Sequence, residues 1–358
     1  MNLFESISRH GHERVCFHWD PETDLRAIVA IHSTVLGNAL GGTRRWCYAS
    51  EESALRDVLR LSEGMTYKAA AADLPMGGAK SVILLAKPNQ PGTEAEGRAM
   101  GRFVDTFGGQ YIAAEDVGVN TQFVDWMARE TQHVMGGETV SVGGDPSPYT
   151  SLGCFNGMKA CLGHLGKPAS FSGLSVAIQG LGATGFKLAR LLRAEGATVY
   201  GSDVNDASVK RAVDELGVIP VEKDRDILGM KCDILAPCAL GGVFSPPVIG
   251  TLNCAIICGT SNNVLVDPDS DGTLIKSRGI LYAPDFVVNA GGLIRLAGLY
   301  LGLTEPQIDR KVADIEETTA SVFREGEAMP SMHAAAVALA KRRIDAGRKA
   351  KREMASST

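Results

Sequence analysis

The apolar positions in the first part of the chain predict an alternation of buried strands and amphipathic helices. Arg26–His32 and Ser81–Ala86 are short apolar runs of a length and composition typical of strands. Between them, Glu51–Gly64 carries apolar residues at helical spacing, and Ser50 stands where a hydroxyl can cap the first free amides of that helix. This part of the chain is therefore expected to form an α/β domain.

From residue 174 onward the pattern changes to short apolar strands that alternate with helices. The expected strands are 174–179, 198–202, 233–236, 255–258 and 280–282. Strands joined by crossover helices form a parallel, doubly wound sheet, which is the Rossmann arrangement of dinucleotide-binding domains. After residue 285 the pattern is helical up to the end of the chain.

A loop rich in glycine and proline, at 136–148, separates these two patterns and predicts a domain boundary. We expect a catalytic domain formed by residues 1–146 plus the C-terminal residues 330–358, and a Rossmann NAD-binding domain at 147–329. A length of 358 residues agrees with two domains. A cleft between the two domains is expected to hold the site.

The composition argues against several other classes of protein. The formal net charge is −5 and the pI is near 5.9, so neither nucleic acid nor an anionic membrane is expected as a partner. No apolar run reaches the roughly 18 residues of a membrane span, and the first residues lack the layout of a signal peptide, so a cytoplasmic location is expected. Eight cysteines without a Cys-x-x-Cys pair, and seven histidines without a His-Glu-x-x-His motif, indicate reduced thiols and no catalytic metal.

A glycine-rich turn between a predicted strand and a predicted helix indicates the cofactor site. It has the G-x-G-x-x-G pattern, in which Gly180 allows a tight turn, Gly182 lets the backbone approach a pyrophosphate, and Gly185 allows close helix–strand packing. Asp203 ends the next strand, 23 residues after Gly180, where a carboxylate accepts hydrogen bonds from the ribose and repels a 2′-phosphate. The pattern therefore predicts NAD as the cofactor, bound also by Leu181, Ala183 and Thr184.

Two lysines and an aspartate of the first domain carry the candidate chemistry. Lys80 follows a glycine turn and precedes a strand expected to be buried on both faces, so desolvation and a second cation nearby would lower its pKa into the range of a general base. Asp116 stands with Glu115 at the end of another predicted strand, a common position for catalytic groups in α/β folds. On this pattern alone, Lys68 could equally extend to solvent, and Asp116 could be an ordinary loop carboxylate or helix cap.

Short motifs spread over nearly the whole chain carry a resemblance to a known family. They are the segments 30–34, 36–37, 39–44, 64–68, 77–80, 114–118, 145–148, 236–242, 262–263, 282–285 and 289–292. In this order they make the chain similar to the Glu/Leu/Phe/Val amino-acid dehydrogenases, and most similar to the leucine-oxidising branch of that family. So many separate motifs in one order make a chance match negligible.

The resemblance implies a role for each candidate residue. Lys68 would bind the α-carboxylate of the substrate, with help from the backbone at Gly42. Lys80 would be the general base that activates water to attack the imine, and Asp116 would exchange protons with the amine. The further residues implied to contact the cofactor are Thr150 at the nicotinamide, Ala236, Pro237 and Cys238 at the ribose, and Asn262 at the carboxamide.

The residues implied around the substrate side chain are apolar: Leu40, Met65, Leu293 and Ile294. Glutamate-specific relatives place a lysine near the position of Leu40, so a side-chain carboxylate would here be buried without a counter-charge, at a cost of several kcal/mol. We therefore expect a branched-chain amino acid, leucine first, as the substrate. An aromatic substrate, phenylalanine or tryptophan, is the alternative, because one methylene in an apolar pocket discriminates weakly.

Two positions depart from the pattern of the family. Ala79 precedes Lys80 where the family usually has a third glycine, and a requirement for positive φ there would cost an alanine roughly 1 kcal/mol. Arg295 stands where relatives commonly have asparagine, and a guanidinium facing the pocket would change the choice of substrate.

The expected reaction converts an apolar L-amino acid, NAD and water to a 2-oxo acid, ammonium and NADH, reversibly, in a homo-oligomer. A catalytically silent NAD-binding regulatory protein is the alternative from another class. The presence of Lys68, Lys80 and Asp116 together argues against it. A 2-hydroxy-acid dehydrogenase would be expected to use a histidine–carboxylate pair, for which the histidines of this chain offer no obvious equivalent.

Overall fold

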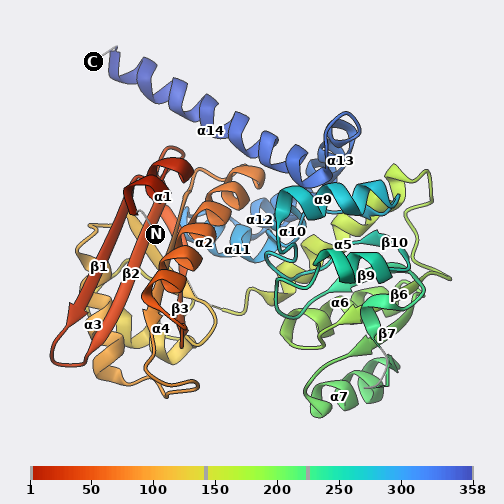
Figure 1. Cartoon of the computed structure of the whole chain (residues 1–358), viewed down its shortest axis with the longest axis horizontal. Coiled ribbons are helices and arrows are strands. Elements are labelled where there is room, and N and C mark those ends of the chain that lie inside the picture. Colours follow the sequence, from red (N-terminus) through yellow and green to blue (C-terminus); the bar gives the residue numbers. More distant parts are fainter. Residues whose placement is uncertain (1–2, 141–143, 223–225, 357–358) are drawn as a thin grey trace. The chain divides into compact units, whose positions relative to one another are not determined.

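The computed structural model describes residues 3–140, 144–222 and 226–356, and the contacts within it divide the chain into two units (Figure 1). Unit 1 comprises Met1–Asp145, Leu296–Gly302 and Ala340–Thr358, and unit 2 comprises Pro146–Arg295 and Leu303–Leu339. The glycine- and proline-rich loop therefore contains the first division, although its residues 141–143 lie outside the described part. No local pattern indicates that the short segment Leu296–Gly302 belongs to unit 1.

Unit 1 is built on a mixed five-stranded sheet with the order β1-β2-β4-β3-β5. Its strands are β1 (Arg14–Asp20), β2 (Leu25–Ser33), β3 (Ala39–Trp46), β4 (Gly77–Leu84) and β5 (Tyr111–Glu115). β2 pairs antiparallel with both β1 and β4, whereas β3 runs parallel to β4 and β5. β3 therefore lies between β4 and β5 in the sheet.

Helices cover both faces of this sheet. The helices of unit 1 before the boundary are α1 (Leu3–His10), α2 (Glu51–Ala71), α3 (Glu94–Asp105) and α4 (Thr121–Ala128). Apolar side chains of α3 and α4 pack with every second residue of β2, from Leu25 to Ile31, while α2 packs on the opposite face against Ile28 and Ala30. Because side chains alternate along a strand, odd-numbered residues of β2 face α3 and α4 and even-numbered residues face α2.

Helix α2 begins as the sequence predicts and ends later. The Ser50 hydroxyl accepts a hydrogen bond from the amide of Ser53, and the two residues form a capping box, which confirms the predicted N-cap. The helix continues beyond Gly64 for another two turns to Ala71, since a single glycine costs a helix only about 1 kcal/mol. Its last turn therefore carries Lys68.

Unit 2 contains a six-stranded parallel sheet with the order β11-β10-β9-β6-β7-β8. Its strands are β6 (Ser175–Gln179), β7 (Thr198–Ser202), β8 (Ile219–Pro220), β9 (Cys232–Pro237), β10 (Cys254–Ile257) and β11 (Leu281–Tyr282). The chain starts at the centre of the sheet, moves outward through β7 and β8, and returns to build the other half from β9. This is the strand order of a Rossmann fold, so the predicted α/β fold class is confirmed.

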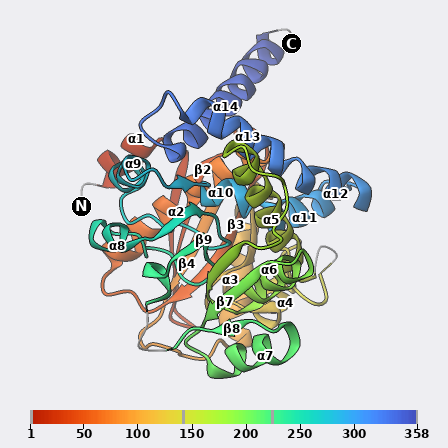
Figure 2. The same cartoon turned by 90° about the vertical axis from the view of Figure 1, so that its right-hand side faces the viewer.

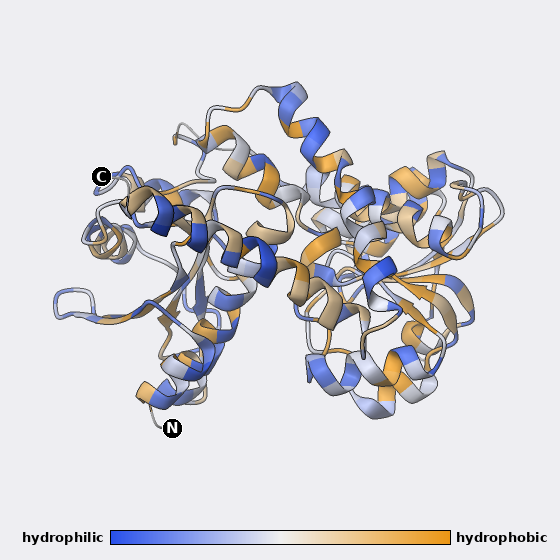
Figure 3. Cartoon of the chain, turned by 90° about the horizontal axis from the view of Figure 1, so that it is seen from above, coloured by the Kyte–Doolittle hydropathy of each residue, from blue (hydrophilic) through white to orange (hydrophobic). Residues whose placement is uncertain are grey.

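Helices lie on both faces of the parallel sheet, as Figure 2 shows. One layer contains α5 (Ser147–His164), α6 (Ala183–Ala194) and α13 (Ile315–Gly326), and the other contains α8 (Pro246–Thr251) and α9 (Pro268–Ser277). The central strands are mostly orange in Figure 3, in keeping with the complete burial of Val176, Ile178 and Ile234. The remaining helices are α7 (Asp206–Leu216), α10 (Asp285–Val288), α11 (Gly291–Tyr300), α12 (Glu305–Ala313) and α14 (Met332–Ser356), with a 3₁₀ turn at Ile227–Gly229. Within the described residues, no helix combines the length and hydropathy that a membrane span requires.

Two buried histidines hold α2 against the sheet of unit 1. Nε2 of His12 lies 3.1 Å from the carbonyl oxygen of Leu59 and 2.9 Å from the hydroxyl of Ser62, and Nδ1 of His32 lies 2.8 Å from the hydroxyl of Thr66. The two imidazole rings meet edge to face at 4.9 Å. Burial, together with the neighbouring His32, lowers the pKa of His12 from 6.5 to about 4. Both histidines thus favour the neutral form.

Acid should destabilise the protein through His12. Because the folded-state pKa lies below the ordinary value, the unfolded chain takes up a proton first, and stability is lost as the pH falls from 6.5 toward 4. Between pH 7 and pH 5 the contribution of His12 to the free energy of unfolding should fall by about 2 kcal/mol. Urea unfolding followed by circular dichroism at the two pH values measures the loss. It should be smaller in His12→Gln, and an equal loss in both proteins would contradict the assignment.

Candidate active site

The face of the unit 1 sheet that α2 covers collects the predicted catalytic residues. Even-numbered residues of β3 and β4 lie on this face, as does the residue that follows β5. The alternation of side chains therefore brings Lys80 of β4 beside Asp116, which follows Glu115 at the end of β5. Nζ of Lys80 lies 3.1 Å from Oδ2 of Asp116.

Burial and neighbouring charges shift the pKa of both partners in this ion pair. The side chain of Lys80 is 6% exposed and that of Asp116 is 20% exposed. Burial lowers the pKa of Lys80, an effect that Asp116 partly offsets and that the positive charge of Arg44 reinforces. Burial raises the pKa of Asp116, but Lys80 and Arg44 outweigh it and hold the pKa at about 2. The aspartate is therefore ionised at neutral pH beside a lysine that releases its proton more readily than a lysine in water.

Arg44 and Asp57 extend the ion pair, and the sequence reasoning did not single out either residue. Nε of Arg44 donates to Oδ2 of Asp116 at 2.8 Å, and Nη1 donates to Oδ2 of Asp57 at 3.0 Å. Asp57 lies on α2 and also accepts a hydrogen bond from the hydroxyl of Tyr48 at 2.8 Å. A signal for Arg44 was present in the sequence, because it stands two residues after Gly42 and thus on the same face of its strand.

Gly42 lets β3 approach Asp116 closely. A Cβ atom at this position would lie 2.4 Å from the carbonyl oxygen of Glu115 and 2.9 Å from Cβ of Asp116. A side chain at residue 42 would therefore push the strand away from Asp116. The backbone of Gly42 therefore lies against the end of β5 and the Cβ atom of Asp116.

The other predicted residues of unit 1 lie on α2 and β3. Lys68 is half-buried in the last turn of α2, and Met65, also half-buried, lies one turn earlier. Leu40 of β3 is buried between the neighbouring strands, where it pairs with Gly78 and Ile112.

Ala79 is accommodated without backbone strain. It lies in β4 opposite Ile31 of β2, and its side chain packs into the core on the face of α3 and α4. The described non-glycine residues with positive φ are Asp24, Asp73, Asn89 and Asn263. An alanine before Lys80 therefore carries no conformational penalty, and the concern raised by this departure from the family pattern is removed.

In unit 2, the glycine-rich turn joins β6 to α6 in the geometry that a dinucleotide requires. Gly180 has a φ of +95°, which favours glycine, and a Cβ at Gly185 would lie 1.9 Å from the carbonyl oxygen of Gly180. Gly182 caps α6 without a side chain, and no described atom lies within 4 Å of the position that its Cβ would take. The amides at the start of α6 are thus open to an anion such as a pyrophosphate.

Asp203 lies beside this turn at the end of β7. Its Oδ2 accepts a hydrogen bond from the amide of Leu181 at 2.7 Å, and its Oδ1 accepts one from the amide of Asn205 at 2.8 Å. A cavity of about 740 Å³ adjoins the carboxylate. The described lining residues that bear charge are all acidic: Asp203, Asp206, Glu222 and Asp226. The turn, the carboxylate and the cavity together fit the adenosine half of a dinucleotide.

The other predicted cofactor residues lie at the edge of the sheet where β6 and β9 end. Ala236 and Pro237 end β9, and Pro237 pairs with Gln179 of β6. Nδ2 of Asn289, a residue that the sequence reasoning did not assign to the site, donates to Oδ1 of Asn262 at 2.8 Å. Such a bond fixes the side-chain amide of Asn262. The remaining two predicted residues are Cys238, directly after β9, and Thr150, in the first turn of α5.

Leu293 and Ile294 lie on the part of α11 that belongs to unit 2, whereas Leu40 and Met65 belong to unit 1. Leu293 is 9% exposed and Ile294 is completely buried. Arg295, which follows them, forms an ion pair with Glu305 and stacks on the ring of Tyr149 at 5.0 Å. The charge of this arginine is therefore matched by an acidic partner within unit 2.

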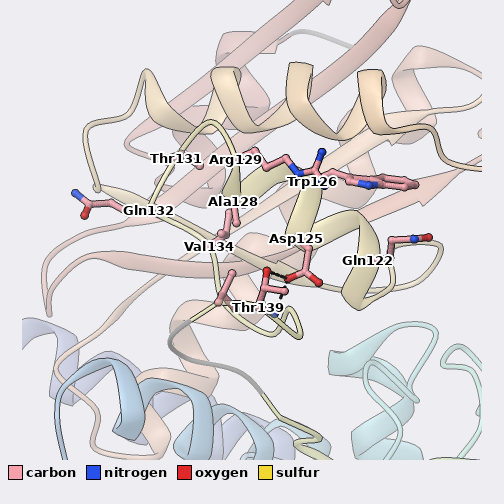
Figure 4. A pocket seen from close by; sticks show the side chains of 10 residues that line it. Gln122, Asp125, Trp126, Ala128, Arg129, Thr131, Gln132, Val134 and Thr139 are labelled. Carbon is pink, nitrogen blue, oxygen red and sulfur yellow. Dashed lines mark hydrogen bonds between the residues drawn. The ribbon is translucent and has the colours of Figure 1, made fainter.

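A second cavity, of about 460 Å³, lies beside α4 in unit 1 (Figure 4). Asp125 lies in it and accepts hydrogen bonds from the amide and the hydroxyl of Thr139 at 2.9 and 2.8 Å. The described lining residues include none of those predicted for catalysis or cofactor binding. This cavity is therefore not part of the candidate active site.

Comparisons with known proteins agree with this geometry. Residues 12–133 match the family described as Glu/Leu/Phe/Val dehydrogenase, dimerisation domain, and residues 204–298 match Glutamate/Leucine/Phenylalanine/Valine dehydrogenase. The leucine dehydrogenase of Geobacillus stearothermophilus is 42% identical over 98% of this chain and 95% of its own length. The phenylalanine dehydrogenase of Bacillus thermotolerans is 39% identical over 91% of this chain and 85% of its own length. The crystal structure of L-tryptophan dehydrogenase from Nostoc punctiforme superposes with a TM-score of 0.82, at 37% identity, over 97% of this chain and 99% of that one.

The close approach at Gly42 should be measurable as stability. Gly42→Ala places a methyl group against backbone and should lower the free energy of unfolding by about 1–3 kcal/mol. Gly64→Ala is a matched control, because no described atom outside its own stretch of helix lies within 4 Å of its Cβ position, and in the helix it should stabilise by about 0.5–1 kcal/mol. Urea unfolding of the two variants measures both effects. A Gly42→Ala variant as stable as the unaltered protein, or more stable, would contradict the packing described for Gly42.

Proposed function

The chain belongs to the Glu/Leu/Phe/Val dehydrogenase family and is an amino-acid dehydrogenase, an oxidoreductase acting on CH–NH₂ groups, and we propose that it deaminates L-leucine with NAD. The reaction joins the amino acid, NAD⁺ and water to give the 2-oxo acid, ammonium, NADH and a proton. The observation that carries the proposal is the buried contact between Lys80 and Asp116, 3.1 Å long, beside the backbone of Gly42.

We assign proton transfer to this pair. Lys80 acts as the general base that removes a proton from the water attacking the imine carbon, which its lowered pKa supports. Asp116 exchanges protons with the substrate amine. Its Oδ2 contacts Lys80 and Arg44, and its Oδ1 accepts no hydrogen bond from the described residues, so one oxygen is left for the amine.

Substrate binding is assigned to Lys68 and to the backbone at Gly42. The α-carboxylate of an amino acid needs a cation, and Lys68 lies on the helix that covers this face of the sheet. Lys68 and the Asp116 carboxylate together match the carboxylate and the ammonium of a zwitterionic substrate.

The cofactor is assigned to unit 2. When bound, a nicotinamide cofactor supplies the acceptor for the hydride that leaves the α-carbon. The open amides at the start of α6 would hold the pyrophosphate, Asp203 the adenosine ribose, and Asn262 the carboxamide. The acidic lining beside Asp203 supports NAD over NADP, since a 2′-phosphate would lie among carboxylates.

The choice between NAD and NADP is testable at Asp203. We expect kcat/KM with NAD to exceed that with NADP by at least about tenfold, and Asp203→Asn to reduce this ratio by at least about fivefold. Asp233→Asn is the control, because Asp233 also accepts a hydrogen bond from a backbone amide, that of Ser175 at 2.8 Å, but does not line the cavity. Equal use of both cofactors by the unaltered protein would refute the assignment of Asp203.

Apolar side chains support leucine as the substrate. Leu40, Met65, Leu293 and Ile294 occupy the positions that the family resemblance assigns to the side-chain pocket. No charge stands at these four positions, and Arg295 is paired with Glu305, so a buried side-chain carboxylate would lack a counter-charge. Several relatives of comparable identity are leucine dehydrogenases.

A panel of L-amino acids with NAD, followed by NADH absorbance, tests the substrate. We expect the highest kcat/KM with leucine, lower values with valine and isoleucine, and a value for glutamate at least about 10³-fold below leucine. Tryptophan or phenylalanine as the best substrate would replace leucine by the aromatic alternative, which the L-tryptophan dehydrogenase of Nostoc punctiforme represents. No activity with any amino acid, in a protein that still binds NAD, would favour a regulatory role.

A homo-oligomer in the cytoplasm completes the proposal. The family description of residues 12–133 as a dimerisation domain supports self-association. Phe17 and Trp19 on the edge strand β1 are 56% and 63% exposed, which is unusual for apolar side chains outside an interface. All eight cysteines are free thiols, as is typical of a reducing compartment. Light scattering against the chain mass of 37.8 kDa tests the assembly.

A further inference from the structure

We propose that Arg44, anchored by Asp57, is a positioning residue for the reaction. It holds the Asp116 carboxylate by one oxygen and places a fixed positive charge beside Lys80. This inference rests on the proposed function, because it assigns Arg44 to the proton-transfer step of Lys80 and Asp116.

The two oxygens of the Asp116 carboxylate have different surroundings. Nε of Arg44 at 2.8 Å and Nζ of Lys80 at 3.1 Å both contact Oδ2. With Oδ2 occupied from two sides, the carboxylate cannot rotate without breaking a charged hydrogen bond. Oδ1 is thereby fixed as the oxygen that exchanges protons with substrate.

Arg44 is itself immobilised. Its Nη1 donates to Asp57 at 3.0 Å, and Asp57 is fixed in turn by the hydroxyl of Tyr48 at 2.8 Å. The planar guanidinium therefore spans from α2 to the end of β5 with one nitrogen on each carboxylate, a geometry that a lysine cannot reproduce. Arg44 and Asp57 are 23% and 18% exposed, so water screens these contacts only in part.

Charges of both signs surround Lys80. The charged and titratable groups around this cluster come from several elements: Arg44 on β3, Tyr48 after β3, Asp57 and Arg60 on α2, and Asp116 after β5, while Tyr111 of β5 packs on the opposite face of the sheet. Arg44 lowers the pKa of Lys80, whereas Asp116 and Asp57 raise it. Loss of the Arg44 charge should make Lys80 hold its proton more tightly, and loss of the Asp57 charge should have the opposite effect.

The neighbouring Arg45 provides a matched control. It is an arginine on the same strand, but its side chain points to the opposite face and binds Glu96 of α3 at 2.8 Å. It is more deeply buried than Arg44, at 4% exposure for the residue. Substitution at Arg45 should therefore disturb stability at least as much, without a change in charge near Lys80.

The experiment compares Arg44→Gln, Arg44→Lys, Asp57→Asn and Arg45→Lys in the full chain. One readout is the pH at the midpoint of the rise in kcat/KM for leucine with NAD. The other is the pH dependence of Lys80 acetylation by acetic anhydride, followed by peptide mass spectrometry, which requires no activity. Lys80→Ala, which should lose at least about 10²-fold in kcat, serves as the reference for loss of the base.

Arg44→Gln should raise both midpoints by about one pH unit and lower kcat by at least about tenfold, with little change in KM for leucine. Arg44→Lys keeps the charge, so its midpoints should stay near those of the unaltered protein while kcat falls, because one ammonium cannot hold both carboxylates. Asp57→Asn should lower both midpoints, and Arg45→Lys should leave them unchanged. Shifts of opposite sign at Arg44 and Asp57 are not expected from a merely structural role.

Midpoints for Arg44→Gln that coincide with those of the unaltered protein would overturn the inference. If circular dichroism shows that Arg44→Gln does not fold, Asp57→Asn decides, and unchanged or raised midpoints there would also overturn it. Failure of the unaltered protein to oxidise any amino acid would count against the proposed function alone. The acetylation of Lys80 would still test Arg44 in that case.

Discussion

A lysine amine buried in the face of a β-sheet is the constraint around which unit 1 is organised. A buried ammonium is stable only beside an opposite charge. Asp116, the residue that follows β5, supplies that charge. The aspartate can come that near only because Gly42 lacks a side chain. The same contacts thus stabilise this part of the fold and set the pKa of Lys80. A substitution that weakens these contacts should change both properties.

Much of this architecture could be predicted from local sequence signals. The period of the apolar residues indicated the strands, Ser50 indicated the start of α2, and the glycine-rich turn with Asp203 indicated the Rossmann unit. Lys80 stood out as a cation in an apolar context. These features are readable because each depends on residues close together in the chain.

The features that the sequence did not predict depend on contacts between distant residues. Arg44 meets Asp116 across 72 positions in sequence, and its spacing from Gly42 indicates the face of the strand but not the partner. The two-residue strand β8 is too short to show periodicity. The role of Ala79 required its backbone conformation, and the partner of Arg295 required the start of α12, ten residues further along the chain. The roles of all the predicted site residues, Lys80 and Asp116 included, stay predictions.

The two adjacent arginines of β3 have a consequence for how the sheet assembles. Arg44 binds carboxylates on one face of the sheet and Arg45 binds Glu96 on the other. A slip of β3 by one residue in one direction would put Arg45 at the site of Arg44 and Trp46 at the site of Arg45. A slip in the other direction would put Arg44 at the site of Arg45 and Thr43 at the site of Arg44, so in either case one of the two sites loses its guanidinium. Apolar residues tolerate such a slip more readily than ion pairs with fixed partners. The two adjacent arginines therefore favour one alignment of β3, and Gly42 lies against Asp116 only in that alignment.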